Sequence, residues 1–238
     1  QFLTDPEHMD EDDVARMLDP DRLARLAAKI DLDHAAPIPE VALAGGGTIF
    51  LATADGEGNL VSLIESNYMG FGSGVMGGET GIMLHNRGAY FHLDPDHPNH
   101  LAPSSRTLHT LMPAMLLRDG RPWVALGAMG GDGQPQTLVQ LVNGLVDDGL
   151  DPQAAVERPR FVLEVEGAGE PLGPIIIEAD GIDDALRSGV ERRGHELRLV
   201  EPHSSVMGWA QAIRREADGS YSGGADPRAD SLAAGPAS

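Results

Sequence analysis

The chain has 238 residues, of which 41% are hydrophobic and 23% charged, a balance typical of a globular domain with a full core. Its formal net charge of −20 makes binding to nucleic acid or to an anionic membrane unfavourable, because both are polyanions. The absence of cysteine excludes disulfides, thiolate metal sites and cysteine nucleophiles. We therefore expect a cytoplasmic protein, and a periplasmic or secreted location stays open because the sequence has no initiator Met that would mark the start of a precursor.

Two short amphipathic helices are predicted within residues 1–36. The acidic run from Asp10 to Asp13 suits the start of a helix, because negative charge there interacts favourably with the helix dipole. Pro20 is well placed for the first turn of a second helix. Residues 33–47 predict irregular backbone that ends in Gly45-Gly46-Gly47, which leaves the chain open to approach by another chemical group.

The sequence after residue 47 predicts strand hairpins, then helices, then further strands. The expected strands are residues 48–54, 60–65, 82–84, 112–117, 123–128, 161–166, 175–178, 197–200 and 206–214. The expected helices are residues 136–147, 151–157 and 182–193, the first with an apolar face of Leu138, Val139, Leu141, Val142, Leu145 and Val146. Residues 85–106, rich in Pro pairs, predict a long ordered loop. This order indicates an α+β fold with antiparallel sheets.

Thr48 is a candidate nucleophile because it opens a strand directly after the glycines. A hydroxyl needs a base to remove its proton. Cleavage of the chain before Thr48 would provide one, since an α-amine with a pKa of about 7.7–8.0 suits general-base catalysis near neutral pH. The alternative is a β-branched residue that simply begins a strand after a loop.

Three other patterns are weaker candidates for chemistry. The backbone N–H groups of Gly130-Gly131 could stabilise an oxyanion or bind phosphate, although no P-loop or dinucleotide pattern surrounds them. His92, His97 and His100 have spacings open to metal ligands, but surface or hydrogen-bonding histidines are the favoured interpretation and no metal or cofactor is expected. Ser73 lies in a near-match to the Gly-x-Ser-x-Gly elbow, without a clear strand before it and helix after it.

Several motifs in register resemble the small subunit of the γ-glutamyltransferase (γ-glutamyltranspeptidase, glutathione hydrolase) family of N-terminal-nucleophile hydrolases. The segments that carry the resemblance are Thr48 with Asp55, Gly58-Asn59, Phe71-Gly72-Ser73-Gly74, residues 81–86, residues 106–113, Gly130-Gly131, Pro159-Arg160-Phe161 and residues 225–228. The resemblance runs from Thr48 to the C-terminus. Residues 1–47 resemble the C-terminal tail of the family's large subunit, so residues 48–238 would be the small catalytic subunit.

The resemblance implies an αββα sandwich that is incomplete without the large subunit, and autocatalytic cleavage of a zymogen before Thr48. Thr48 would be the nucleophile, and Gly130 and Gly131 would form the oxyanion hole. Asp55 and Asn59 would be structural residues near the site. The implied substrate-binding positions are Ser66, Asn67, Arg87, Tyr90, His109 and Thr110.

The sequence departs from the transferase pattern at the positions that bind the glutamyl group in the family. The family has an aspartate where Tyr90 stands and a pair of serines where His109 and Thr110 stand. An asparagine two residues after the Ser66 position is replaced by Tyr68, although Asn67 is adjacent. A site that hydrogen-bonds one substrate group rejects analogues that lack it, so these changes resemble a divergent, acylase-like branch with a different substrate.

We therefore expect an amidohydrolase or acyltransferase that forms an acyl-enzyme on Thr48, with glutathione or another γ-glutamyl or acyl amide as substrate. Its expected partner is the large subunit of the same precursor, and a homo-oligomer of such heterodimers stays open. The alternatives are a non-catalytic or unprocessed subunit and, least favoured, a metal-dependent hydrolase that uses the histidine loop.

Overall fold

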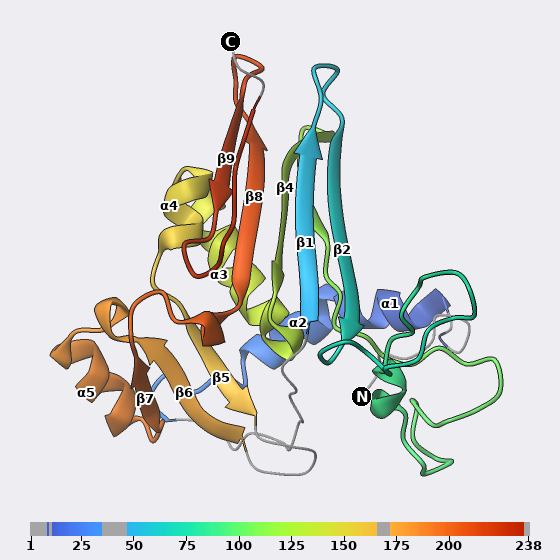
Figure 1. Ribbon diagram of the computed structural model, residues 1–238. Coiled ribbons are helices and arrows are strands. Elements are labelled where there is room, and N and C mark those ends of the chain that lie inside the picture. Colours follow the sequence, from blue (N-terminus) through green and yellow to red (C-terminus); the bar gives the residue numbers. More distant parts are fainter. Residues whose placement is uncertain (1–8, 10, 35–46, 166–171, 236–238) are drawn as a thin grey trace.

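The structure is a computed structural model that describes residues 9, 11–34, 47–165 and 172–235 (Figure 1). Its α-helices are α1 (Glu11–Leu18), α2 (Pro20–Ala27), α3 (Gln134–Val146), α4 (Pro152–Glu157) and α5 (Asp184–Arg192). Its strands are β1 (Gly47–Ala54), β2 (Leu60–Tyr68), β3 (Ala114–Arg118), β4 (Arg121–Met129), β5 (Phe161–Val165), β6 (Leu172–Glu178), β7 (Leu197–Val200), β8 (Trp209–Arg215) and β9 (Tyr221–Ala225). Short 3₁₀ helices span Arg87–Tyr90, Gly131–Gly133, Ala179–Gly181 and Ser205–Met207.

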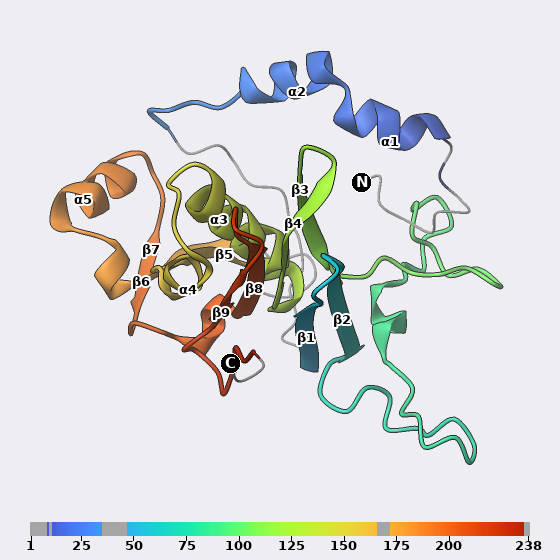
Figure 2. The same ribbon diagram turned by 90° about the horizontal axis from the view of Figure 1, so that it is seen from above.

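The β1–β2 hairpin stacks on a four-stranded antiparallel sheet of order β3-β4-β8-β9 (Figure 1). Ser62 donates a hydrogen bond from Oγ to the carbonyl oxygen of Leu126 at 3.1 Å. A Cβ on Gly127 would lie 2.3 Å from the Phe50 ring, so glycine allows the hairpin to approach β4 closely. Helices α3 and α4 pack on the other face of the sheet (Figure 2). Helices, sheet and hairpin therefore form three successive layers.

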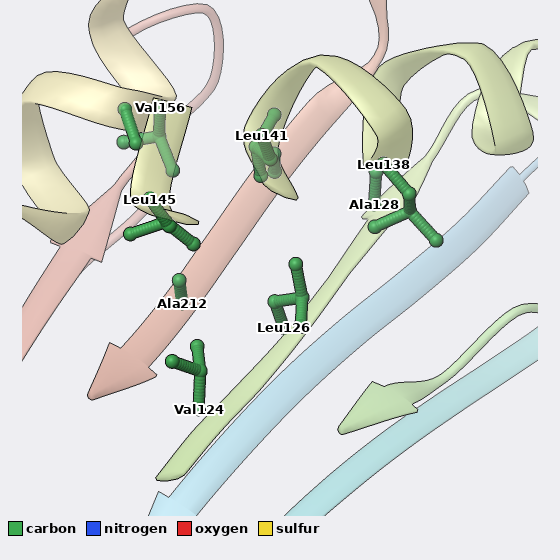
Figure 3. Packing of buried hydrophobic residues seen from close by; sticks show 10 residues of the cluster. Val124, Leu126, Ala128, Leu138, Leu141, Leu145, Val156 and Ala212 are labelled. Atoms are coloured by element: carbon green, nitrogen blue, oxygen red, sulfur yellow. The ribbon is translucent and has the colours of Figure 1, made fainter. Parts of the chain in front are cut away.

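The main core lies between the four-stranded sheet and its helices (Figure 3). The fully buried side chains of this core come from β4, β8, α3 and α4, and include Val124, Leu126, Leu141, Val156 and Ala212. Alternate residues of β4 face the helices and the hairpin, as the period of a strand requires. The prediction of a wide apolar face on α3 was wrong at its margins: Val139 and Val146 are exposed, because the buried face follows the i, i+3, i+4 positions 134, 137, 138, 141, 144 and 145.

A second, three-stranded sheet has the order β5-β6-β7. β6 and β7 are parallel, which corrects the expectation of antiparallel sheets alone. The reason is that α5 lies between them in sequence and acts as a crossover, whereas a short turn would have made the pair antiparallel.

One further expectation on strands was wrong, and one strand was missed. Residues 82–84 form no strand, and Met83 makes only an isolated bridge to Met76 across a glycine-rich turn. β9 was not expected, because its sequence is rich in serine and glycine. A Cβ on Gly224 would lie 2.4 Å from the carbonyl oxygen of Pro152, so the strand needs glycine to pack against α4.

The N-terminal helices confirm the predicted pair. Pro20 occupies the first turn of α2, and Asp19 caps it by accepting a hydrogen bond from the Arg22 N–H at 2.6 Å. The apolar side chains Leu23 and Leu26 are exposed, and Figure 2 shows α1 and α2 lying apart from the sheets. Gly45 and Gly46 lie outside the described residues. Within the described part of the chain, no helix has the length and apolarity needed to cross a bilayer.

Candidate active site

Thr48 lies at the start of β1, opposite Ser66 of β2. Its Oγ1 donates a hydrogen bond to the Ser66 Oγ at 3.0 Å. The Ser66 hydroxyl donates in turn to the carbonyl oxygen of Gly47 at 3.1 Å and accepts from the Tyr68 N–H at 2.9 Å. A hydroxyl has one donor and two acceptor positions, so all the bonding capacity of Ser66 is used. One side chain therefore holds both the Thr48 hydroxyl and the carbonyl of the preceding peptide bond.

The backbone around the Gly47–Thr48 bond is irregular and tightly packed. The strand register shifts between these two residues, and Tyr68, opposite Gly47, has a φ of 76°. A positive φ at a bulky residue costs on the order of 1–3 kcal/mol and is found mostly at functional sites. A Cβ on Gly47 would lie 3.0 Å from the carbonyl oxygen of Gly70. The irregularity falls on the bond where cleavage is predicted.

Gly130 and Gly131 follow the end of β4, at the same end of the molecule as the start of β1 (Figure 1). Their φ angles of 144° and 55° lie in the region that glycine adopts without steric cost. Gly208 packs against this turn, since a Cβ there would lie 2.3 Å from the carbonyl oxygen of Met129. Met129 and Thr48 line the same groove. The two glycines thus follow a residue that lines the same groove as Thr48, and their oxyanion role stays a prediction.

Two tyrosines connect Ser66 with this glycine turn. The ring centres of Tyr68 and Tyr90 are 4.9 Å apart. The Tyr90 hydroxyl donates to Asp132 Oδ2 at 2.8 Å, and Asp132 directly follows Gly131. Burial first, and the charge of Asp132 second, raise the pKa of Tyr90 above its ordinary value. Tyr90 is therefore a neutral hydroxyl held by a carboxylate, where the family resemblance would place a carboxylate.

Arg87 lies beside the tyrosines and is buried, with its guanidinium carbon 5.4 Å from the centre of the Tyr68 ring. Its Nη1 donates to Thr110 Oγ1 at 3.2 Å. Burial lowers the pKa of Arg87, and the neighbouring Tyr90 and Tyr68 oppose that shift. Burial and then the charge of Arg87 lower the pKa of His109, which favours the neutral imidazole at pH 7. The structure therefore brings Arg87, Tyr90, His109 and Thr110 together next to Ser66.

Asp55 and Asn59 are structural, but the expectation that they lie near the site was wrong. Asp55 Oδ1 accepts from the N–H groups of Glu57 and Asn59 at 2.9 Å each, and Oδ2 accepts from Asn59 Nδ2 at 2.7 Å. These bonds close the hairpin turn at the far end of β1. Asp55 comes seven positions after Thr48, which corresponds to about 23 Å along an extended strand.

Asn67 supports the loop after β2, where its carbonyl oxygen accepts from the Asn86 N–H at 3.1 Å. No role for Asp132 or Gly208 was predicted from the sequence. Tyr68 was noted only because it replaces an asparagine of the family pattern. Asp132 and Tyr68 each adjoin a residue that was predicted. Gly208 has no local signal, because its contact with Met129 depends on the pairing of β4 with β8.

The remaining candidates have structural roles in the described residues. Ser73 Oγ donates to the carbonyl oxygen of Leu84 at 2.8 Å and accepts from the Val75 N–H, which closes an exposed loop. The His92 and His97 rings stack at 4.1 Å. Across the described residues, no three histidine or acidic side chains are placed to hold a metal ion together.

Comparison with known proteins decides the family. Residues 1–235 match the model of the gamma-glutamyltranspeptidase family. The chain belongs to the γ-glutamyltranspeptidase family. It is 40% identical over 233 residues to the glutathione hydrolase-like YwrD proenzyme of Bacillus subtilis, and 39% identical over 239 residues to the oxamate amidohydrolase proenzyme of Klebsiella pneumoniae. Each alignment covers 98% of this chain and 43% of the relative, so the chain spans less than half of their length.

The fold of this γ-glutamyltranspeptidase-family chain matches solved structures. A cephalosporin acylase from Bacillus halodurans superposes with a TM-score of 0.82 at 36% identity, covering 97% of this chain and 41% of the acylase. A γ-glutamyltranspeptidase mutant from Helicobacter pylori superposes with a TM-score of 0.64 at 23% identity, covering 76% of this chain and 99% of the other. The α+β fold of the N-terminal-nucleophile type is therefore confirmed.

Proposed function

We propose that this chain carries the catalytic centre of an amidohydrolase or acyltransferase in which Thr48 forms an acyl-enzyme. The observation that carries the proposal is the Ser66 hydroxyl, which contacts both Thr48 Oγ1 and the Gly47 carbonyl oxygen. In the uncut chain, Thr48 Oγ1 attacks the Gly47 carbonyl carbon, the amide C–N bond breaks, and an ester and a free Thr48 amine form. Water then hydrolyses the ester and leaves Gly47 as a carboxylate.

The freed amine of Thr48 then serves as the base for turnover. It accepts the hydroxyl proton as Oγ1 attacks the substrate carbonyl, because an α-amine with a pKa of about 7.7–8.0 is close enough to neutral pH for its unprotonated form to act as a general base. The N–H groups of Gly130 and Gly131 stabilise the tetrahedral oxyanion. The proton passes to the leaving amine as the C–N bond breaks, and water or an acceptor amine resolves the ester.

The proposed substrate is glutathione or another γ-glutamyl or acyl amide. The names of the relatives describe amide-cleaving enzymes that act on different acyl groups: a glutathione hydrolase-like protein, an oxamate amidohydrolase and a cephalosporin acylase. Tyr90 in this chain supports an acyl group other than glutamyl, since its neutral hydroxyl supplies no carboxylate for an α-amine.

The proposed partner is a large subunit released from the same precursor, to which residues 1–47 would belong. The relatives are named proenzymes, which supports processing. Four outward side chains of the β1–β2 hairpin are apolar yet exposed, which supports a covering layer in the assembled enzyme; they are Ile49, Leu51, Val61 and Leu63.

The substitution Thr48→Ala tests the proposal in the full-length protein. It removes the nucleophile, so we expect neither cleavage before residue 48 nor amide turnover, and no acyl adduct in intact mass spectrometry after mixing with substrate. Thr53→Ala is the matched control, because Thr53 lies exposed on the same strand away from the site. Turnover that survives in Thr48→Ala would refute the mechanism. A wild type that is folded but as inactive as Thr48→Ala would indicate a non-catalytic subunit.

A further inference from the structure

The turn that contains Gly130 and Gly131 has a single side chain that can hold it in place. Residues 130–133 are all glycine except for Asp132. Glycine is the least restrained of the residues, so a segment of this composition keeps one shape only where contacts fix it. The Gly133 N–H donates to the carbonyl oxygen of Gly130 at 3.0 Å, which closes the turn from within. Asp132 is therefore the one position from which a side chain can fix the orientation of the turn.

The hydroxyl of Tyr90 supplies such a contact. It donates to Asp132 Oδ2 at 2.8 Å, between residues that lie 42 positions apart in the sequence. Burial and the charge of Asp132 raise the pKa of Tyr90, so the phenol keeps its proton and stays a donor. A hydrogen bond to a carboxylate is about twice as strong as one between neutral groups. Tyr90 therefore holds the middle of the glycine turn with a charge-assisted hydrogen bond.

Tyr90 is itself fixed through both its backbone and its ring. Its carbonyl oxygen accepts from Asn99 Nδ2 at 2.6 Å, and Asn99 is buried. Its ring centre lies 4.9 Å from that of Tyr68, whose N–H donates to Ser66 Oγ at 2.9 Å. Ser66 in turn accepts from Thr48 Oγ1 at 3.0 Å. A continuous set of contacts therefore connects the proposed nucleophile with the glycine turn.

We propose that Tyr90, acting through Asp132, is a positioning residue for the two backbone N–H groups that stabilise the oxyanion. This inference rests on the proposed amide chemistry at Thr48. Donors that face a developing negative charge contribute most when the fold fixes them before the reaction begins. A displacement of about 1 Å can slow an enzyme by about 100-fold. The hydroxyl of Tyr90 therefore acts on the transition state without touching the substrate.

The first test removes only the hydroxyl, in the full-length, processed protein. The amide is whichever of glutathione and p-nitroacetanilide the wild type cleaves faster. In Tyr90→Phe we expect kcat to fall by about 30-fold and KM to change by less than about twofold, because the donors remain but are less well oriented in the transition state. Tyr221→Phe is the matched control and should keep the wild-type kcat, since the Tyr221 hydroxyl donates to the carbonyl oxygen of Asp55 at 2.9 Å, at the far end of β1. A rise in KM with an unchanged kcat would overturn the proposal, because Tyr90 would then bind the substrate directly.

Variants at Asp132 test whether the hydrogen bond itself is responsible. Asp132→Ala removes the acceptor and should lower kcat as much as Tyr90→Phe does. Asp132→Asn keeps an oxygen that accepts from the Tyr90 hydroxyl, so kcat should recover to within about threefold of the wild type. The double variant Tyr90→Phe/Asp132→Ala should be no slower than either single variant, since both changes remove the same contact. Losses that multiply in the double variant would overturn the proposal.

Hydrogen exchange separates this inference from the proposed function, because it needs no substrate. Mass spectrometry of the peptide that covers residues 130–134 should show exchange about tenfold faster in Tyr90→Phe and Asp132→Ala than in the wild type. An inactive wild type with this dependence of exchange on Tyr90 would contradict the Thr48 mechanism and leave the positioning contact standing. An active wild type with an equal kcat in Tyr90→Phe would overturn the role of Tyr90 and leave the mechanism standing. A fall in kcat without faster exchange would also overturn that role, because the turn would then keep its position without the hydroxyl.

Discussion

Ser66 contacts both the proposed nucleophile and the carbonyl group that it would attack. Its hydroxyl accepts from Thr48 Oγ1 and donates to the carbonyl oxygen of Gly47. Donation to that carbonyl draws electron density toward oxygen and makes the carbonyl carbon a better electrophile. The same contact orients the nucleophile. A single hydroxyl therefore supports both attack and polarisation at the predicted cleavage bond.

The substitution Ser66→Ala should slow self-cleavage by about 100-fold, the lower end of the loss measured when one oxyanion donor is removed. The rate of appearance of the cleaved chain on denaturing gels measures this effect. Ser62→Ala is the matched control, since Ser62 lies on the same strand but bonds to the carbonyl oxygen of Leu126 on β4. Equal cleavage rates in the Ser66 variant and the wild type would contradict the assigned contact.

The sequence predicts this residue pair only through the family resemblance. Thr48 has a local signal, because three glycines precede a strand. Ser66 has none, since its role depends on the register that places it opposite Thr48. That register includes an irregularity beside Gly47, which period-two alternation does not predict. The buried state of Arg87 also depends on the tertiary fold, so its sequence position alone indicated only a substrate-binding role.

At the scale of elements, the site depends on two turns that approach each other. The turn after β4 contains Gly130 and Gly131, and the one before β8 contains Gly208 with a φ of 71°. The Thr137 hydroxyl on α3 donates to the carbonyl oxygen of Met207 at 3.3 Å and holds the second turn against the helix. The position of the predicted oxyanion hole is therefore set by β8 and α3 as well as by β4.

The substitution Gly208→Ala should reduce amide turnover strongly, because the new Cβ would lie 2.3 Å from the carbonyl oxygen of Met129 and displace the adjoining glycine turn. Gly219→Ala is the control, since Gly219 has a φ of 88° but no atom within 4 Å of the place its new methyl group would occupy. The backbone conformation costs both variants about 1 kcal/mol. Steady-state kinetics should separate them, and equal kcat values would contradict the role of Gly208.

The sequence predicted most elements but not all of their pairings. The hairpins β1–β2 and β3–β4 have turn residues that fix their partners. The pairing of β4 with β8 joins segments some 80 residues apart along the chain, and no local pattern indicates it. β9 was not predicted because its glycines disfavour a strand, although the packing against α4 requires glycine there. Local patterns therefore predict the individual helices and hairpins, whereas the order of strands within the sheet depends on long-range contacts that they do not indicate.

At the scale of the whole molecule, a buried network of charges joins the two sheets. Asp226, after β9, pairs with Arg160, before β5, and with Arg228 at 3.1 Å. Arg228 also pairs with Glu178 at the end of β6, and all four side chains are buried. The Ala210 N–H on β8 donates to Asp226 Oδ2 at 2.8 Å. The chain segment after β9 is therefore fixed to both sheets.

The substitution Asp226→Asn should destabilise the protein by about 3–5 kcal/mol, because removing one charge leaves buried arginines without compensation. Asp148→Asn is the matched control: its ion pair with Arg158 is about half exposed and should contribute about 0–1 kcal/mol. Urea unfolding followed by circular dichroism measures both. Similar midpoints for the two variants would contradict a structural role for the network.

The central claim is that Thr48 becomes a free N-terminus and then acts as nucleophile and base. Intact mass spectrometry of the full-length protein after expression, with N-terminal sequencing of the smaller product, tests this claim most directly. We predict a product whose first residue is Thr48, with the preceding fragment ending at Gly47. A single uncut species that persists on long incubation would contradict the claim, because Thr48 would then have no free amine to accept its proton.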